Sequence, residues 1–421
     1  LSLRSAACQS SDQYETLLNR LQDRPRGPTL VYVTLQKTAE EVAQRLADAG
    51  LPATSYHAGM DADKRHEIQQ DFISSKDAIV VATIAFGMGI DKSDIRYVYH
   101  FNPPKSLESY AQEIGRAGRD GLDSICELLL VPEDRIVLEN FTYGDTPSRR
   151  SVGRLIDLIA GQADTFHVSH YKLSSETDIR ILVVRTLLTY LELDGYLKAT
   201  SPRYDSYKIK PLVTSKTILD HFDGERREFL SGVLSSLTKG RVWFSLNTVL
   251  TARRLGVERE RIVKAVDYMA EQGWLEVQVS DLVHGYRFLR RIDEPKTLSD
   301  RLFQGLVDRE QNEVSRVEQI MQLGSAETCL AATLSQHFGE TLAEPCGICT
   351  ACRGDGPIEI PSISARSIGS ASKQVIDQLA SEYPDRFSTA RDRSRFLCGL
   401  SSPGLTRARL TRHASFGVCS Q

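Results

Sequence analysis

The chain has 421 residues, of which 41% are hydrophobic and 25% charged, so it is long enough to bury cores in two to four domains. The formal net charge of −3 excludes a protein that is basic throughout, and any contact with nucleic acid must come from local patches. No apolar run approaches the ~18 residues of a membrane span, and no secretory signal is visible, so we expect a cytoplasmic protein without a membrane partner.

The first part of the chain alternates strand-like and helix-like patterns. Residues 1–26 are typical of a connection, and an apolar strand is predicted over residues 29–34. A helix over 38–50, a strand over 53–57, a helix over 61–75 and a strand over 78–83 follow. This order and spacing predict a parallel sheet covered by helices.

Two motifs follow the last of these strands. The first is a glycine-punctuated turn with Gly87 and Gly89, followed by Asp91. The second, residues 112–121, sets Arg116 and Arg119 three residues apart, on one face if that stretch is helical. Adjacent arginines suit the spread negative charge of a transferring phosphoryl group. Taken singly, the glycines also fit an ordinary turn, and the arginines a solvated charged face.

In their order along the chain, these motifs resemble the second motor lobe of RecQ-type DNA helicases. AFGMGID is similar to motif V of that family, and QEIGRAGRDG to motif VI. The likeness runs without a gap from about residue 29 to 130 and implies a RecA-like fold. RNA-unwinding DEAD-box proteins usually carry His where this chain has Gln112, so the resemblance favours DNA over the rival hypothesis of an RNA helicase lobe.

The resemblance also implies roles for individual residues. Gln112, Arg116 and Arg119 would be catalytic, and Gly89 and Asp91 would line the cleft that binds ATP. The YHAG stretch with His57 and Gly59, together with Thr34 and Thr83 after their strands, would face DNA. Contacts of this kind go to phosphates and set register without reading sequence.

A motor of this class also needs a phosphate-cradling GxxxxGK[ST] loop, and none occurs in the 421 residues. The chain begins at Leu1 instead of Met. We therefore expect the C-terminal portion of a longer helicase, with ATP and Mg²⁺ held at the interface with a missing N-terminal RecA-like lobe. A naturally lobe-less regulator is the alternative.

Residues 148–295 contain two winged-helix-like patterns. In the first, helices are followed by a turn at Gly195 and a short hairpin. In the second, a turn at Gly256 separates two helices, and strands 275–279 and 286–289 would form a wing around His284 and Gly285. Aromatic and basic side chains in these wings either touch DNA or close the wings onto their own helices, and the second interpretation is favoured for each one: Tyr204, Tyr207, Lys208, Tyr286 and Arg287.

Four cysteines carry a separate signal within residues 296–356. Cys329, Cys346, Cys349 and Cys352 have the spacing C-x16-C-x2-C-x2-C, after a polar helix or hairpin predicted over 300–322. Four thiolates at this spacing suit a tetrahedral, structural Zn²⁺ site, with the first ligand at the start of a helix. Two disulfides or a redox CxxC are the alternatives, and His337 is a spare ligand candidate. The segment is again similar to the RecQ zinc module.

The last region, residues 357–421, begins as a Gly/Pro/Ser-rich linker and ends in helical patterns. From residue 361 onward it has nine Lys/Arg against four Asp/Glu. Arg407 and Arg409 would bind DNA phosphates and make binding salt-dependent, and a merely solvated basic helix is the alternative.

Together these patterns predict a multidomain α/β plus mostly α protein. Its regions would be an interlobe connection (1–26), a RecA-like lobe (27–147), an inserted winged-helix-like region (148–295), a zinc-binding helical module (296–356) and a basic helical end (357–421). The expected function is the C-terminal part of an ATP-dependent 3′–5′ DNA helicase acting on single-stranded and forked DNA in replication, recombination or repair. We expect a bacterial-type, nucleoid-associated location. A non-catalytic DNA-binding adaptor is the rival hypothesis.

Overall fold

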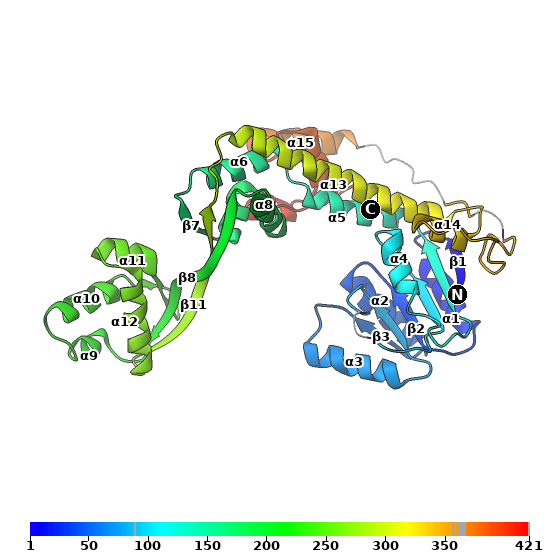
Figure 1. Cartoon of the computed structure of the whole chain (residues 1–421), viewed down its shortest axis with the longest axis horizontal. Helices are drawn as coiled ribbons and strands as arrows, with labels where there is room; N and C mark the ends of the chain where they lie inside the picture. Colours follow the sequence, from blue (N-terminus) through cyan, green and yellow to red (C-terminus); the bar gives the residue numbers. More distant parts are fainter. Residues whose placement is uncertain (88–89, 356–357, 361–367, 420–421) are drawn as a thin grey trace. The chain divides into compact units, whose positions relative to one another are not determined.

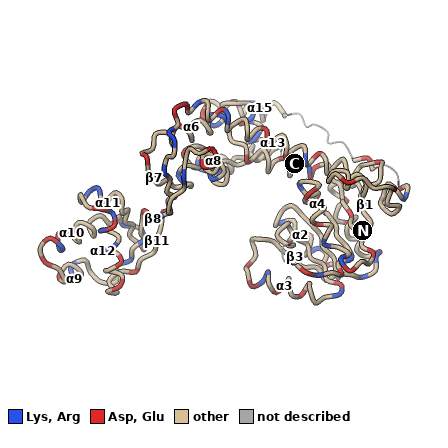
Figure 2. The backbone as a smooth tube through the Cα atoms, in the orientation of Figure 1, with Lys and Arg blue, Asp and Glu red and all other residues tan. Residues whose placement is uncertain are grey.

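The computed structural model describes residues 1–87, 90–355, 358–360 and 368–419 (Figure 1). The chain divides into two units. Unit 1 comprises Leu1–Thr146, Gly305–Ser401 and Ala408–Gln421, and unit 2 comprises Pro147–Gln304 with Ser402–Arg407. Basic and acidic residues are interspersed along both units (Figure 2).

Unit 1 is built on a six-stranded, parallel sheet with the strand order β1-β6-β5-β2-β4-β3. All residues of β2, β4 and β5 are buried, which is typical of parallel strands covered on both faces. The strands are β1 (Ser2–Ala7), β2 (Thr29–Tyr32), β3 (Ala53–Tyr56), β4 (Ile79–Ala82), β5 (Tyr97–His100) and β6 (Ile125–Leu130).

Alternation along the strands divides the core of unit 1 into two layers. Leu30 and Tyr32 of β2 belong to one buried cluster, together with Phe72 and Tyr110. Val31 belongs to the other cluster, with the helices on the opposite face. On the first face lie α3 (Ala62–Ser74) and α4 (Leu107–Ile114), and on the second α1 (Gln13–Gln22) and α2 (Gln36–Asp48).

The prediction that residues 1–26 are only a connection is wrong. Strand β1 pairs in parallel with β6, from Ser2 opposite Ile125 to Ala7 opposite Leu130. Helix α1 buries Leu17 and Leu21 in the second cluster. A six-residue strand with few apolar side chains carries little periodic signal, so its place at the sheet edge depends on β6, more than 100 residues away.

Unit 1 also contains helices from the end of the chain. Helix α13 (Pro295–Gly324) is a single 30-residue helix that begins in unit 2, so of the two alternatives predicted over 300–322 the helix is present and the hairpin is not. Arg395 donates to the carbonyls of Thr146 and Gly144 at 2.8 and 3.1 Å, and Arg391 pairs with Glu310 of α13. The other helices are α5 (Pro132–Asp145), α14 (Leu330–His337), α15 (Ser370–Glu382), α16 (Ala390–Leu397) and the short 3₁₀ helix η1 (Leu410–Arg412).

Unit 2 is organised around a five-stranded sheet with the order β7-β11-β8-β10-β9. Its strands are β7 (Thr165–Val168), β8 (Leu197–Pro211), β9 (Thr238–Lys239), β10 (Phe244–Asn247) and β11 (Leu275–Phe288). Its helices are α6 (Arg149–Ala160), α7 (His170–Thr177), α8 (Ile181–Leu193), α9 (Ser215–Leu219), α10 (Gly224–Ser235), α11 (Thr248–Leu255), α12 (Arg259–Glu271) and α17 (Pro403–Arg407).

The prediction of two separate wings is wrong. Strands β8 and β11 pair with each other, antiparallel, from Leu197 opposite Phe288 to Pro211 opposite Leu275. The pairing forms the long ribbon of Figure 1, and the chain between the two strands folds as α9–α12 at the ribbon's far end. His284 and Gly285 lie within β11 and do not form a turn. A run of alternating residues looks the same whether its partner is a local hairpin strand or a distant one.

The interpretation that the wing aromatics close onto their own structure is confirmed for two of them. Tyr207 and Tyr286 are buried. The Tyr286 hydroxyl lies 3.0 Å from Nε2 of His170, whose ring stacks on His284 with centroids 3.8 Å apart. Tyr204 is 40% exposed and remains accessible.

The α9–α12 module has its own core. Leu246, Ile262, Val266 and Met269 are fully buried within it. Helices α11 and α12 are joined by a turn at Gly256, which takes the left-handed conformation that favours glycine. Among the described residues, no helix has both the length and the apolar character needed to cross a membrane.

Candidate functional site

The residues expected to face nucleic acid lie at one edge of the parallel sheet. Thr34, His57 and Thr83 follow the carboxyl ends of β2, β3 and β4, which are neighbours in the order β2-β4-β3. Carboxyl ends of parallel strands meet at the same edge, so the topology gathers these three positions. The Thr83 amide donates to the Tyr56 carbonyl at 3.2 Å, which ties two of the loops together.

Within this edge, the side chains are not equally available to a ligand. His57 is 5% exposed, and its Nε2 lies 3.0 Å from Glu40 of α2. Its imidazole therefore holds the loop against α2. Gly59 is exposed, and a Cβ there would lie 2.6 Å from Oε1 of Gln36. The Thr34 amide is occupied by the Asn102 side-chain oxygen at 3.1 Å, which leaves its hydroxyl as the donor.

A partly buried carboxyl, Asp134 of α5, supports this edge of the sheet. Asp134 accepts from Asn102 at 2.9 Å and from Gln13 at 3.2 Å. Burial raises the pKa of Asp134 to about 6, although these two hydrogen bonds oppose the shift. Asp134 thus holds the side-chain amide of Asn102, whose oxygen accepts from the Thr34 backbone amide.

Arg116 and Arg119 lie in a turn and not on a helix, because α4 ends at Ile114 and Gly118 adopts a φ of +63°. Arg116 donates through Nη1 to the Gly87 carbonyl, and its Nε is buried without a partner in the described residues. A Cβ at Gly87 would collide with the Arg116 guanidinium, so this approach requires glycine. The motif V turn and the first motif VI arginine are therefore in direct contact.

Arg119 is more accessible than Arg116. Its Nη1 lies 3.9 Å from Asp91, a fully exposed carboxylate, and its Nε donates to the Gly115 carbonyl at 3.3 Å. Gln112 is on the exposed side of α4. Gly89 lies outside the described residues. A cation held this loosely at the surface is free to turn toward an anionic ligand.

Beneath these arginines the lobe contains a buried polar pair that the motifs alone did not indicate. Nε2 of His100 lies 2.7 Å from Glu113 of α4, and the His100 ring stacks on Tyr32 with centroids 5.4 Å apart. The Tyr32 hydroxyl donates to the Phe86 carbonyl at 3.3 Å, and burial raises its pKa. The pair thus supports the segments that carry Gly87 and Arg116.

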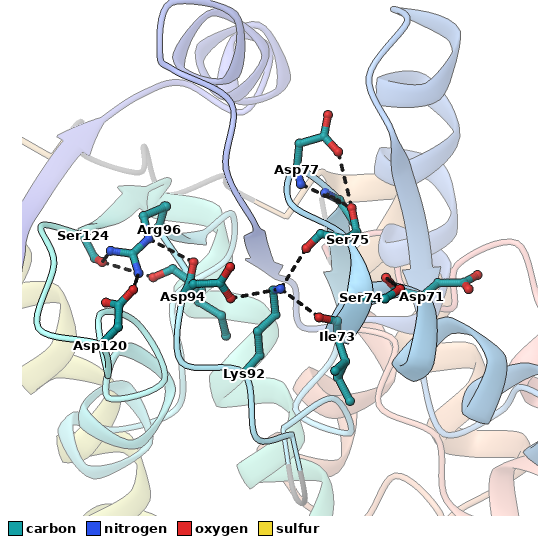
Figure 3. Close-up of polar contacts among 12 residues, drawn as sticks. Asp71, Ile73, Ser74, Ser75, Asp77, Lys92, Asp94, Arg96, Asp120 and Ser124 are labelled. Carbon is teal, nitrogen blue, oxygen red and sulfur yellow. Dashed lines mark hydrogen bonds and ion pairs between the residues drawn. The ribbon is translucent and has the colours of Figure 1, made fainter.

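A second set of contacts that sequence reasoning missed surrounds Lys92, the residue directly after Asp91 (Figure 3). Its Nζ donates to the carbonyls of Ile73 at 3.0 Å and Ser75 at 2.8 Å and pairs with Asp94 at 3.0 Å. Near it, Arg96 bonds Asp120, and that bond lowers the pKa of the Asp120 carboxyl. The only signal in the sequence was the lysine that ends the AFGMGIDK run.

The four cysteines come together at the start of α14. Cys329 is the residue before this helix, as predicted, and the four Sγ atoms lie within 4.8 Å of one another. A tetrahedral Zn²⁺ with Zn–S bonds of ~2.3 Å requires sulfurs about 3.8 Å apart. The Cys346 and Cys352 sulfurs are 3.9 Å apart, which fits zinc and is far longer than the ~2.05 Å of a disulfide.

Backbone amides favour the thiolate form of two of these cysteines, Cys329 and Cys349. The Cys346 amide donates to Sγ of Cys329 at 3.3 Å, and the Leu330 amide donates to Sγ of Cys349 at 3.4 Å. Burial raises the pKa of Cys329, but the amide bonds outweigh it and bring the pKa to about 6. His337 lies outside the cluster and bonds Glu108 at 3.1 Å.

The two C-terminal arginines are placed differently from each other. Arg407 belongs to unit 2 and donates to the Ser175 carbonyl of α7. Arg409 belongs to unit 1, where it precedes η1 with a φ of +59°. Both stay predictions as DNA contacts.

Two family models match separate parts of this chain. The helicase conserved C-terminal domain matches residues 12–121, which includes α1, and RecQ zinc-binding matches residues 288–353, which includes all four cysteines. The cysteine cluster is therefore a structural zinc site.

The curated proteins that are similar to this chain are helicases by name. ATP-dependent DNA helicase Q-like 5 of Arabidopsis thaliana is 27% identical over 89% of this chain and 42% of its own length. The Bacillus subtilis ATP-dependent DNA helicase RecQ is 49% identical over 26% of this chain and 18% of its own length. The mouse bifunctional 3′-5′ exonuclease/ATP-dependent helicase WRN is 50% identical over 26% of this chain and 8% of its own length.

The chain thus spans less than half the length of each of these relatives. Among solved structures, the E. coli DEAD-box protein SrmB, bound to regulator of ribonuclease activity A, matches 33% of this chain and 82% of its own, at 25% identity and a TM-score of 0.30. The helicase C-terminal domain and the RecQ zinc-binding region occur in this order on one chain, which in these two parts is similar to the C-terminal portion of RecQ helicases.

Proposed function

We propose that this chain acts in an ATP-dependent DNA helicase that moves 3′ to 5′ along one strand of a forked duplex, in replication, recombination or repair. The observation that carries the proposal is the contact between the two motifs: Arg116 reaches the Gly87 carbonyl, and Arg119 stands beside Asp91. This places one accessible arginine and one fixed arginine on the lobe surface where motifs V and VI meet.

In this proposal the chain supplies arginines and a partner lobe supplies the phosphate loop. A first RecA-like lobe would hold ATP and Mg²⁺, and Arg119 would exchange its weak pairing with Asp91 for the γ-phosphate. Such an arginine stabilises the charge of the transferring phosphoryl group. Arg116, whose guanidinium is held by Gly87, would keep the motif V turn in place beside it.

DNA would lie along the sheet edge that gathers Thr34, Gly59 and Thr83. The hydroxyls and the exposed loop at Gly59 suit phosphate contacts, which carry no sequence information. His57 would act through the position of its loop, since its ring is bonded to Glu40. A DNA substrate would place the protein at the nucleoid of a bacterial-type cell.

DNA-stimulated ATP hydrolysis, measured with the chain alone and with a protein that also carries the first lobe, tests this proposal. We expect no turnover by the chain alone and retained binding of single-stranded DNA. With the first lobe present, Arg119→Ala should lower kcat at least ~10³-fold. Arg26→Ala is the matched control, because Arg26 is an exposed arginine of the same lobe that pairs with Asp77.

The outcomes separate the two hypotheses for this chain. If the two-lobe protein binds DNA but hydrolyses no ATP, the chain is an adaptor and the helicase proposal is wrong. If the chain alone hydrolyses ATP and Arg119→Ala abolishes it, the nucleotide is bound within these residues and the two-lobe arrangement is wrong.

A hollow in the α9–α12 module supports a second DNA contact. It has a volume of about 350 Å³, and its charged lining consists of Arg203 of β8, with Arg253, Glu258 and Arg259 around the turn between α11 and α12. Arg259 bonds the Tyr204 carbonyl at 2.6 Å and Arg203 bonds Asp205 at 2.9 Å, whereas Arg253 has no ion pair with any described residue. In a helix-turn-helix, the N-terminal end of the second helix, which directly follows the turn, enters the major groove of a duplex.

We propose that Arg253 neutralises a duplex phosphate. Arg253→Gln should weaken duplex binding and reduce the slope of log affinity against log salt by about one. Lys216→Gln, an exposed lysine in α9 of the same module, serves as the control and should leave the slope unchanged. Equal slopes for the two variants would exclude the hollow as a phosphate site.

A further inference from the structure

Lys92 is a buried cation whose donors are fully used. Its side chain is 5% exposed, and its three acceptors are the Ile73 and Ser75 carbonyls and the Asp94 carboxylate, all within 3.0 Å (Figure 3). An ammonium group has three donors, so each is satisfied. Burying such a charge is costly unless every donor is paired, which gives the arrangement a single geometry.

The acceptors of Lys92 belong to the end of another element. Ile73 is in the last turn of α3, and Ser75 is its C-terminal cap. Unpaired carbonyls and the helix dipole make this end negative, so a cation is stabilised there. Lys92 therefore attaches the segment after motif V to α3, a helix that follows the Gly59 loop.

Residues 93–95, which follow Lys92, hold the turn 118–120 that carries Arg119. The amide of Asp120 donates to the Ser93 carbonyl at 3.2 Å, and the amide of Gly118 donates to the Ile95 carbonyl at 3.0 Å. These two bonds lie on either side of Arg119. The backbone position of Arg119 thus depends on residues 93–95.

Arg96 strengthens the same support from its other end. Its guanidinium bonds the Asp120 carboxylate and, at 3.0 Å, the Asp94 carbonyl (Figure 3). It also donates to the Asp123 carbonyl at 3.2 Å. Asp120 follows Arg119 directly. The side chain of Arg96 therefore joins the segment 93–96 to the residue next to the proposed finger.

We propose that Lys92 and Arg96 are positioning residues for Arg119: together they hold the turn 118–120 against α3, so that the arginine is presented in one place. This inference rests on the proposed function of Arg119, and neither residue touches a ligand. Asp91, which lies between the motif V turn and Lys92, adds a side-chain contact to Arg119: its carboxylate is 3.9 Å from Nη1 of Arg119.

Hydrogen exchange of this chain tests the positioning directly, without ATP. Lys92→Met keeps the aliphatic stem and removes all three bonds, and we expect at least tenfold faster exchange of the Gly118 and Asp120 amides. Lys64→Met is the matched control, because Lys64 is an exposed lysine on α3 that pairs with Glu67 at 2.8 Å. It should leave both amides unchanged, and Lys92→Arg, which keeps donors, should restore most of the protection.

The two-lobe protein supplies the functional measurement. Lys92→Met should lower kcat for ATP at least tenfold while KM for ATP stays within twofold, since only the finger is displaced. Arg96→Lys keeps the charge but loses the planar, multidentate guanidinium. It should also lower kcat without changing KM, by a smaller factor. If Lys92→Met does not fold, Asp94→Asn is judged by the same two criteria.

The possible failures are distinguishable. Unchanged exchange at Gly118 and Asp120 in a folded Lys92→Met chain overturns the inference whatever the ATP hydrolysis. A wild-type two-lobe protein without ATP hydrolysis overturns the proposed function, while the exchange experiment still decides whether Lys92 positions the turn. A kcat effect with a parallel rise in KM would also contradict a pure positioning role.

Discussion

Zinc removal should open the edge of the parallel sheet as well as the zinc loop. The loop that carries Cys346, Cys349 and Cys352 lies along strand β1 and bonds it three times. Ser5 donates to Oγ1 of Thr350 at 3.0 Å, Thr350 donates to the Leu3 carbonyl at 3.1 Å, and Ser2 donates to the Ile348 carbonyl at 2.9 Å. Because β1 is an edge strand, these bonds cover groups that would otherwise be unpaired.

The size of the effect follows from the number of bonds. Each contributes roughly 1 kcal/mol, so the loss of three lowers the local opening free energy by about 3 kcal/mol. At 1.4 kcal/mol per factor of ten this corresponds to roughly 10²-fold faster exchange of the Ser5 amide. The global loss is larger, because Cys329, Leu330, Leu334 and Cys349 belong to the same buried cluster as the sheet.

Hydrogen exchange of the first eight residues, with and without zinc, is the assay. Cys349→Ala removes a fully buried ligand and should lower the zinc content from one ion per chain to nearly none, as measured by metal analysis. Cys398→Ala is the control, since Cys398 is a half-buried free cysteine outside the cluster. A zinc-free chain in which the Ser5 amide exchanges at the wild-type rate would refute the reasoning.

Three further predictions concern other parts of the chain. The pKa of Asp134 is about 6 in the fold against an ordinary 3.8, so its protonated form contributes stability that is fully present below pH 4 and is lost as the pH rises through 6. In urea unfolding, the wild type should lose about 1 kcal/mol of stability relative to Asp134→Asn between pH 5 and 7. An equal dependence of stability on pH in the two proteins would contradict this. Tyr286→Phe leaves His170 without its 3.0 Å partner and should cost about 1 kcal/mol in the same assay. Ile262→Ala removes a fully buried side chain from the α9–α12 core and should destabilise that module by 2–5 kcal/mol in thermal unfolding, whereas Val279→Ala, at a half-exposed position, should have little effect.

Much of unit 1 was predictable because its signals are local. The alternation of apolar strands with amphipathic helices predicts a parallel sheet, and the sheet is present with β2, β3 and β4 in the expected places. The glycine turn and the two arginines were recognisable as motifs. The cysteine spacing predicted a zinc site, and the four sulfurs do converge.

The errors all involve partners that are distant in sequence. Strand β1 gains its identity from β6, and β8 pairs with β11 across the whole α9–α12 module. A pattern of alternating residues reports which face is buried but not which strand lies alongside. Whether Arg116 and Arg119 share a helix was left open by the sequence; α4 ends at Ile114, and the turn that carries the two arginines docks on residues 93–95.

The sequence by itself determined the resemblance to RecQ helicases, the zinc ligands and the order of motifs, since each depends on residue type and spacing over a few positions. The tertiary structure alone decided that His57 is bonded to Glu40, that Arg116 reaches Gly87 and that Lys92 caps α3. Those contacts join segments whose approach is set by the packing of the whole lobe. The spacing of residues along the chain does not predict that packing, because the packing depends on many weak contacts between distant segments that form together.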